Sequence, residues 1–242
     1  MNPEDGLDNE NEFIYHIDND YQYGGANVKR NIFQNMAHGV LQNCAKPEGR
    51  IGKLIVRMMN SAHTPLSKWG LAHLELAPDA DVIDLGCGGG SNVSAMLEAC
   101  PAGHVTGFDY SPVSVEASKK KNAAAIDEGR CSILEGDVAE LPFSDDSFDA
   151  ATAFETVYFW PENSFAGVRR ILKPGGRFLI VCEADGSCPG DETWPKLIDG
   201  MKLKSRDELV CELENAGFKD VFSDSRSVMG EKGRWLCVCA KK

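Results

Sequence analysis

The sequence predicts an α/β fold, with helices on both faces of a mostly parallel sheet, and three observations support this prediction. The chain has 242 residues, 43% of them hydrophobic and 26% charged, which is enough for one globular domain with a full core. From residue 81 onward, short apolar runs alternate with amphipathic stretches, the pattern of strand–helix units. Glycines follow the apolar run at residues 82–85, at the turn where open α/β sheets bind nucleotide-like ligands. This composition excludes disordered, collagen-like and disulfide-stabilised miniproteins.

Residues 1–78 are predicted to form an N-terminal tail and a helical cap, and residues 79–242 the α/β domain. Residues 1–27 carry seven acidic side chains and no Lys or Arg, as a solvated terminus does. Two apolar stripes at helical spacing follow, and then a third helix that begins at Thr64. The stripes consist of Val28, Ile32, Phe33, Met36, Val40 and Leu41, and of Ile51, Leu54, Ile55, Met58 and Met59. They can be buried only against the α/β body or over its ligand cleft, so the cap is not expected to fold independently.

Seven strands and four helices are expected in the α/β region. The strands are Val82–Leu85, His104–Asp109, Cys131–Glu135, Phe148–Phe154, Arg177–Ala184, Phe218–Ser223 and Arg234–Ala240. The helices are Ser91–Ala99, Pro112–Ile126, Asn163–Leu172 and Ser205–Ala216. Capping signals mark three helix ends, at Ser111, at Ser205 with Glu208, and at Gly217. The irregular stretch 185–204, rich in glycine and proline, has the length of an active-site lid.

The glycine-rich loop is the strongest single indication of function. In VIDLGCGGG (82–90), glycines fall at the first, third and fifth positions from Gly86, whereas a dinucleotide fingerprint needs one at the sixth, which is Ser91. Asp84 places a carboxylate beside the loop, which would repel a pyrophosphate but suits an amino or sulfonium group. The pattern therefore favours S-adenosylmethionine over NAD. Asp109, which ends the next strand, can accept hydrogen bonds from both hydroxyl groups of a ribose, a role that either cofactor would use.

Four motifs in register resemble those of the class I S-adenosylmethionine-dependent methyltransferases, in particular the small-molecule group similar to the ubiquinone/menaquinone C-methyltransferases. The motifs are VIDLGCGGG, GFDYSP, GDVAELPFSDDSFD and ILKPGGRFLI. The resemblance covers residues 81–184 well and the last two strands more loosely. It implies a Rossmann-like, seven-stranded sheet whose last strand is antiparallel, with S-adenosyl-L-methionine as cofactor and S-adenosyl-L-homocysteine as product. It also implies that Pro174, Gly175 and Gly176 form a structural turn before the fifth strand.

The resemblance also assigns cofactor-binding residues at the ends of the first four strands. The matching positions are Asp84, Gly86, Cys87, Gly88, Asp109, Tyr110, Asp137, Val138 and Phe154. The glycine-rich loop would line the methionine part, with Asp84 reaching the amino group directly or through water. Asp109 would bind the ribose, and Tyr110 would pack near the adenine. Asp137 and the backbone of Val138 would contact the adenine edge.

Several residues near the expected cleft are candidates for a catalytic base. In-line methyl transfer requires chiefly that the acceptor atom be held about 3 Å from the methyl carbon and that water be excluded. A base is needed for a hydroxyl or ring-carbon acceptor but not for a thiolate, an amine or a metalloid. The candidates are Glu155, Tyr158, His63 and His16, each with a purely structural role as the alternative. By the resemblance, Phe154 would lie under the cofactor and Glu155 beside the transferred methyl.

Composition limits the partners and the compartment. With 25 Lys and Arg against 37 Asp and Glu, the net charge of −12 makes nucleic acid an improbable partner. No apolar run approaches the ~20 residues that span a bilayer, so no membrane association is expected. Nine scattered cysteines without an N-terminal signal indicate a reducing cytoplasm. They are interpreted as small buried hydrophobes, and no metal site is predicted.

The sequence therefore predicts a cytoplasmic methyltransferase with a small-molecule acceptor. Tyr15, Tyr21 and Tyr23 suggest that residues 10–27 close over the bound cofactor. One alternative is a non-catalytic protein that binds the cofactor or its product as a sensor or partner subunit. A nicotinamide-dependent oxidoreductase and an arsenite methyltransferase are weaker alternatives. The acceptor, its atom type and the choice between monomer and homodimer are left open.

Overall fold

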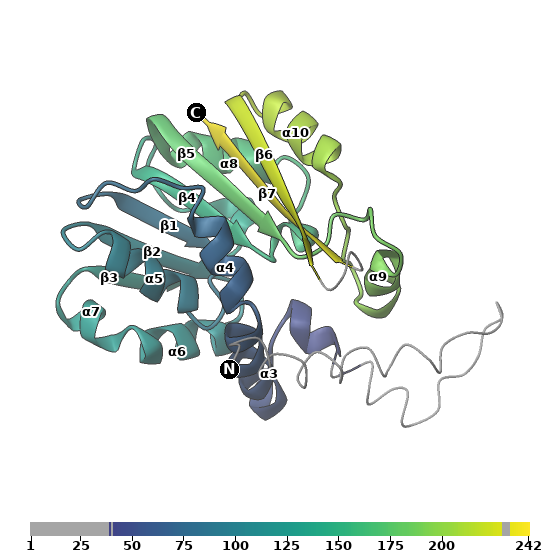
Figure 1. Cartoon of the computed structure of the whole chain (residues 1–242). Helices are drawn as coiled ribbons and strands as arrows, with labels where there is room; N and C mark the ends of the chain where they lie inside the picture. The colour runs from purple at the N-terminus through teal and green to yellow at the C-terminus, as the bar shows by residue number, and fades with distance from the viewer. Residues whose placement is uncertain (1–38, 40, 229–232) are drawn as a thin grey trace, which may run out of the picture. The chain divides into compact units, whose positions relative to one another are not determined.

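The computed structural model describes residues 39, 41–228 and 233–242, and these residues belong to one compact unit. Its described part contains one sheet of seven strands in the order β3-β2-β1-β4-β5-β7-β6 (Figure 1). The strands are β1 (Asp81–Leu85), β2 (His104–Asp109), β3 (Cys131–Glu135), β4 (Phe148–Phe154), β5 (Leu172–Cys182), β6 (Lys219–Val228) and β7 (Gly233–Lys241). β1 to β5 pair in parallel, and β7 runs antiparallel to both β5 and β6. The predicted Rossmann-like sheet with an antiparallel last strand is confirmed.

Helices cover both faces of the sheet (Figure 1). Each face has its own apolar core. The main covering helices are α4 (Thr64–Leu71), α5 (Ser91–Ala99), α6 (Pro112–Lys121), α7 (Ala123–Asp127), α8 (Ser164–Ile171) and α10 (Arg206–Asn215). Ile83 and Leu85 of β1 enter the core that contains α8 and α10. Val82 enters the other core with α4, α5, α6 and α7. This alternation follows from the two-residue period of a strand and explains why β1 is apolar on both faces.

The predicted helix-capping signals are present. The Ser111 hydroxyl accepts a hydrogen bond from the backbone at the start of α6. Ser205 and Glu208 form a reciprocal capping box at the start of α10. Gly217 follows α10 with a φ of +90°, the left-handed conformation that glycine adopts without strain. Each cap satisfies backbone groups that a helix end otherwise leaves unpaired.

Some element bounds differ from the prediction. The helix expected over 112–126 is divided into α6 and α7, because Asn122 leaves the helical conformation and its side-chain amide donates to a carbonyl of the glycine-rich loop. β5 begins at Leu172 rather than Arg177, since Leu172 pairs with Phe148 before the register shifts. The Pro-Gly-Gly segment therefore lies within an irregular start of β5 rather than before the strand. β6 also runs beyond its predicted end.

α3 (Gly49–Ala62) and α4 are described parts of the predicted cap, and the burial expected for the second apolar stripe is confirmed only in part. Of this stripe Ile55 is buried, as is the neighbouring Val56, which was not part of the prediction. Three apolar residues of the same helix are more than half exposed, namely Ile51, Leu54 and Met58. Their spacing places them on one outer flank of the helix, where no described element covers them.

Several predictions fall outside the described residues. These are the proposed closing segment 10–27 with its three tyrosines, the candidate base His16, and most of the first apolar stripe. The predicted lid at 185–204 is described, and it contains the short helices η4 (Asp191–Thr193) and α9 (Trp194–Leu197).

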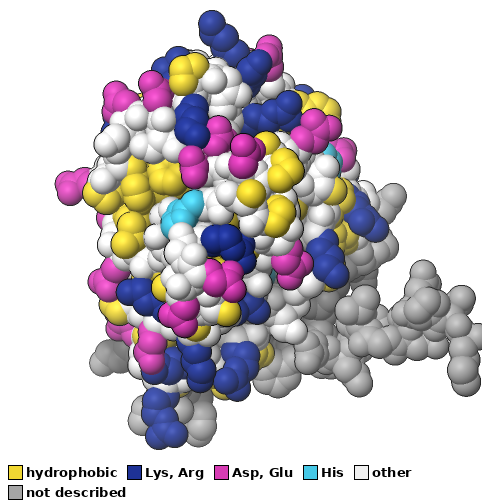
Figure 2. All heavy atoms as spheres, turned by 90° about the vertical axis from the view of Figure 1, so that its left-hand side faces the viewer, with side chains coloured by type: hydrophobic (Ala, Val, Ile, Leu, Met, Phe, Trp, Pro, Cys, Tyr) yellow, Lys and Arg dark blue, Asp and Glu magenta, His cyan; other side chains and the backbone are white. Residues whose placement is uncertain are grey.

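The surface carries charges of both signs. Figure 2 shows one face on which acidic and basic side chains are interspersed and apolar side chains form small separate groups. No helix in the described ranges is both long enough and apolar enough to cross a bilayer.

Candidate active site

A cavity of about 250 Å³ opens at the carboxyl ends of β1 to β4. The loops that follow these strands line one side of it, and α3 with the start of α4 lines the other. Ten of the predicted site residues line this cavity, namely His63, Gly86, Cys87, Gly88, Asp109, Tyr110, Asp137, Val138, Phe154 and Glu155. Of the predicted site residues that the structure describes, the other two, Asp84 and Tyr158, are buried and do not line it. Parallel strands thus bring residues that follow four different strands to one place.

Two glycines of the loop after β1 have different structural roles. A Cβ atom on Gly86 would lie 2.3 Å from Oγ1 of Thr156, so this glycine permits close packing against the segment after β4. Gly88 has a φ of +51°, and a Cβ atom there would meet no protein atom within 4 Å. Because Gly88 lines the cavity, that Cβ would occupy space open to a ligand. The loop therefore needs one glycine for protein packing and the other for ligand access.

Asp109 is the buried carboxylate at the end of β2. The backbone N–H of Gly88 donates to its Oδ2, and that of Ser111 to its Oδ1, each at 2.8 Å. Burial raises the pKa of Asp109, and these two hydrogen bonds oppose the increase. Each oxygen retains acceptor capacity. The carboxylate is thus held rigidly and can still accept hydrogen bonds from hydroxyl groups in the cavity.

Asp84 is a fully buried carboxylate of β1 that has one side-chain hydrogen-bond partner among the described residues. Its Oδ1 accepts a hydrogen bond from Oγ1 of Thr152 at 2.7 Å, and its Oδ2 has no hydrogen-bond partner among the described residues. Burial raises the pKa of Asp84 to about 7, against the effect of the Thr152 hydroxyl, and the charge of Asp109 adds to the increase. A buried carboxylate without full compensation destabilises the fold. A positive group bound nearby would remove that cost.

The loops after β2 and β3 form the end of the cavity predicted to bind adenine. Asp137 accepts a hydrogen bond from the N–H of Ala139 at 2.9 Å, so it caps a short 3-10 helix and also lines the cavity. The hydroxyl of Tyr110 donates to the carbonyl of Ala45, which ties this end of the cavity to the segment before α3. Burial raises the pKa of Tyr110 to about 12, so the hydroxyl remains a neutral donor.

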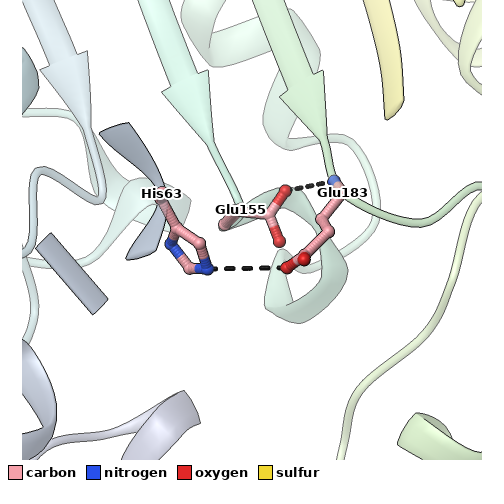
Figure 3. Close-up of side chains that lie close together, drawn as sticks. All are labelled: His63, Glu155 and Glu183. Carbon is pink, nitrogen blue, oxygen red and sulfur yellow. Dashed lines mark hydrogen bonds and ion pairs between the residues drawn. The ribbon is translucent and has the colours of Figure 1, made fainter. Parts of the chain in front are cut away.

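Glu155 follows β4 directly, in the left-handed backbone conformation with a φ of +57°. This conformation is uncommon for a residue other than glycine and is concentrated at functional sites. Its carboxylate Oε1 accepts a hydrogen bond from the backbone N–H of Glu183 (Figure 3). The hydroxyl of Tyr158 donates a second hydrogen bond to the same oxygen at 3.4 Å. Burial and then the charge of Glu183 raise the pKa of Glu155. The strained backbone and the two donors together hold this carboxylate at the cavity.

His63 and Glu183 converge on Glu155 from two other elements (Figure 3). Nε2 of His63 lies 3.5 Å from Oε2 of Glu183. Burial lowers the pKa of His63, but its interactions with the two carboxylates outweigh this and leave the pKa raised. Partial burial raises the pKa of Glu183, but the hydrogen bond and the charge of His63 leave it lowered overall. The pair is therefore an ion pair when His63 is protonated.

Sequence reasoning missed Glu183, which follows β5 by one residue. The parallel pairing of β4 with β5 places it beside Glu155. Asp109 was predicted from the same signal, a polar residue at the end of a strand. Applied to the fifth strand with its correct end at Cys182, this signal would have found it.

Tyr158 lies within the apolar core rather than in the cavity. Its hydroxyl lies 3.3 Å from the carbonyl of Ala184 as well as near Glu155. Burial raises the pKa of Tyr158 well above its usual value, so it stays neutral. This placement suits a residue that positions Glu155 rather than one that contacts an acceptor.

The described residues fit S-adenosylmethionine. The carboxylate of Asp109 retains acceptor capacity for ribose hydroxyls. Gly88 leaves space that a side chain would fill. The unpaired oxygen of Asp84 can be compensated by a cationic amino group, through a water because Asp84 does not itself line the cavity.

Comparisons with known proteins agree with this geometry. A family model described as a methyltransferase domain matches residues 83–180. The O-methyltransferase rstn1 of Aspergillus nomiae is 30% identical over 156 residues, which cover 62% of this chain and 69% of that protein. The demethylmenaquinone methyltransferase of Staphylococcus aureus is 31% identical over 152 residues, which cover 62% of this chain and 60% of that protein. Other matches cover as little as 48% of a relative's length.

Solved structures share the fold. A methyltransferase solved in complex with the Haloferax volcanii Trm112 methyltransferase activator is 26% identical, with a TM-score of 0.69 and coverage of 77% of this chain and 92% of that chain. The geranyl diphosphate C-methyltransferase of Streptomyces coelicolor, solved with S-adenosyl-L-homocysteine, is 14% identical with a TM-score of 0.64, and the match covers 75% of this chain and 76% of that chain.

Proposed function

Because the chain belongs to the class I S-adenosylmethionine-dependent methyltransferases, we propose that it transfers the methyl group of S-adenosyl-L-methionine to a small organic acceptor. The observation that carries the proposal is the rigidly held Asp109 carboxylate facing a glycine-lined cavity. Relatives named as O-methyltransferases and as a demethylmenaquinone methyltransferase support a small-molecule acceptor.

The cavity offers each part of the cofactor a different set of groups. Asp109 accepts hydrogen bonds from the ribose hydroxyl groups, and the loop from Gly86 to Gly88 lies along the methionine part. Asp137 and Tyr110 line the adenine end. Asp84 balances the charge of the amino group through a water, which relieves the cost of its own burial.

The acceptor occupies the opposite end of the cavity, near His63 and Glu155. S-adenosylmethionine supplies a methyl group on positively charged sulfur, so transfer to the acceptor is an in-line displacement in which sulfur takes the bonding electron pair. The chain has to orient the acceptor and exclude water. Phe154 and Trp160 contribute apolar surface to the cavity, and Tyr158 holds Glu155 at the acceptor.

The test is methyl transfer from S-adenosylmethionine labelled in its methyl group. The purified full chain is incubated with the labelled cofactor and a metabolite extract, and label is followed into small molecules. The proposal predicts a labelled product that requires both protein and extract and that is lost in Asp109→Asn. Binding of S-adenosyl-L-homocysteine without transfer to any extract would instead favour the non-catalytic sensor.

A further inference from the structure

Three side chains with metal-ligating atoms meet at the acceptor end of the cavity (Figure 3). They are His63 from the corner between α3 and α4, Glu155 at the end of β4, and Glu183 at the end of β5. One ligand atom from each lies within 4.8 Å of the other two. Because residues 63, 155 and 183 are far apart in the sequence, no spacing motif predicts this cluster.

We propose that His63, Glu155 and Glu183 bind one divalent transition-metal ion of the Mn²⁺ or Zn²⁺ type. One imidazole nitrogen and two carboxylate oxygens suit these ions better than Ca²⁺ or Mg²⁺, which prefer oxygen ligands alone. Three protein ligands leave at least one coordination position open, and His63 and Glu155 both line the cavity. Binding of the ion does not depend on the proposed function. The role that we assign to the ion, which is to hold an oxygen atom of the acceptor, rests on the proposed function.

The charges in the cluster favour a cation. Two carboxylates face a single imidazole, and in the described part of the chain neither Glu155 nor Glu183 forms an ion pair with a lysine or arginine. Like charges at this distance repel each other in a partly buried site. A divalent ion supplies the missing positive charge.

The ligands are already partly oriented. The backbone N–H of Glu183 and the hydroxyl of Tyr158 occupy Oε1 of Glu155, which leaves Oε2 for an ion. Such supporting hydrogen bonds are typical of metal-binding carboxylates. Metal–ligand distances of about 2.0–2.2 Å require the ligand atoms to approach one another somewhat further. The side chain of Glu183 is 56% exposed, so it can supply this movement by rotation.

The ion would favour an acceptor whose methylated atom is an oxygen. A hydroxyl group bound to a divalent cation ionises more readily and releases its proton to water. The resulting oxygen anion forms the new bond to the methyl carbon as the carbon–sulfur bond breaks and its electron pair goes to sulfur. O-methylation of a hydroxyl or enol therefore follows from this site.

The proposal is tested by titrating the full chain with Mn²⁺. Binding is measured as the decrease in the electron paramagnetic resonance signal of the free ion. Mn²⁺ is the probe because it prefers oxygen and imidazole ligands to the thiols of the free cysteines. The wild type should bind one ion per chain in the micromolar range. Glu183→Gln and His63→Asn should each weaken binding by about tenfold or more. Glu98→Gln, which removes an exposed carboxylate at the end of α5, is the matched control and should leave the affinity unchanged.

The absence of saturable Mn²⁺ binding, or binding that Glu183→Gln leaves intact, would overturn the metal site. The His63–Glu183 contact would then be an ion pair alone. Titration of the same samples with S-adenosyl-L-homocysteine separates the two proposals. Binding of S-adenosyl-L-homocysteine without binding of Mn²⁺ overturns only the metal site. Binding of Mn²⁺ without binding of S-adenosyl-L-homocysteine supports the metal site and contradicts the proposed function.

Discussion

Asp84→Asn is predicted to stabilise the ligand-free protein increasingly as the pH rises. The carboxyl group has a pKa of about 7 in the fold against an ordinary value of 3.8. Between these values the folded state binds one more proton than the unfolded state, so the wild type loses stability with rising pH, by about 1.4 kcal/mol per pH unit. The full difference corresponds to about 4 kcal/mol above pH 7. Asparagine does not titrate, and its side-chain oxygen can still accept the hydrogen bond from Thr152.

Urea unfolding of both proteins from pH 5 to pH 8 measures this effect. The free energy of unfolding of the variant minus that of the wild type should increase by about 3 kcal/mol over this range. Packing changes caused by the amide are present at every pH, so the comparison at pH 5 is the internal control. A difference that stays constant with pH, or that decreases, would refute the argument that Asp84 is buried without compensation.

The same substitution should weaken cofactor binding. A bound amino group stabilises the Asp84 carboxylate, so binding of S-adenosyl-L-homocysteine near pH 7 should release up to about half a proton per chain from the wild type, because the carboxyl group is about half protonated there. Calorimetry in buffers of different ionisation enthalpy detects that proton. Asp84→Asn should bind S-adenosyl-L-homocysteine more weakly than the wild type and should release fewer protons on binding. A stability gain would then accompany a functional loss, as expected for a strained site.

Three further predictions concern the cavity and its scaffold. Asp109→Asn should weaken S-adenosyl-L-homocysteine binding by about tenfold or more in calorimetry, because an amide would direct its NH₂ at one of two backbone N–H donors; unchanged affinity would exclude it as the ribose ligand. Gly88→Ala and Gly129→Ala both place a side chain at positive φ in open space, so each should lower the free energy of unfolding by about 1 kcal/mol. Only Gly88→Ala should reduce the affinity for S-adenosyl-L-homocysteine, because Gly88 lines the cavity. Equal affinities of the two variants would contradict the role of Gly88. Ser205→Ala should lower the free energy of unfolding by about 1 kcal/mol in urea titration, and no loss would mean that the capping box is not stabilising.

The sequence was sufficient for the parts of the fold that local rules determine. Apolar runs located β1 to β4, and the Ser205 signal located the start of α10. The position of Asp109 at a strand end predicted it as a site residue, because parallel strands share one carboxyl edge, whereas Glu155 was predicted from the family resemblance. The start of β5 at Leu172 depends on pairing with Phe148, which no local pattern encodes.

The parts of the site that depend on packing between distant segments could not be predicted. The position of His63 beside Glu183 requires the corner between α3 and α4 to lie against the end of β5. The burial of Asp84 without a second partner depends on the contacts around β1. Helical periodicity predicted α3, but it did not show that only one flank of the helix contacts the body.

The most direct test of the account is calorimetric titration of the full chain with S-adenosyl-L-homocysteine and, separately, with NADH. The account predicts binding of S-adenosyl-L-homocysteine at one site per chain in the micromolar range, and no binding of NADH. Binding of NADH without S-adenosyl-L-homocysteine would contradict the assignment of the cavity at the carboxyl ends of β1 to β4 to S-adenosylmethionine.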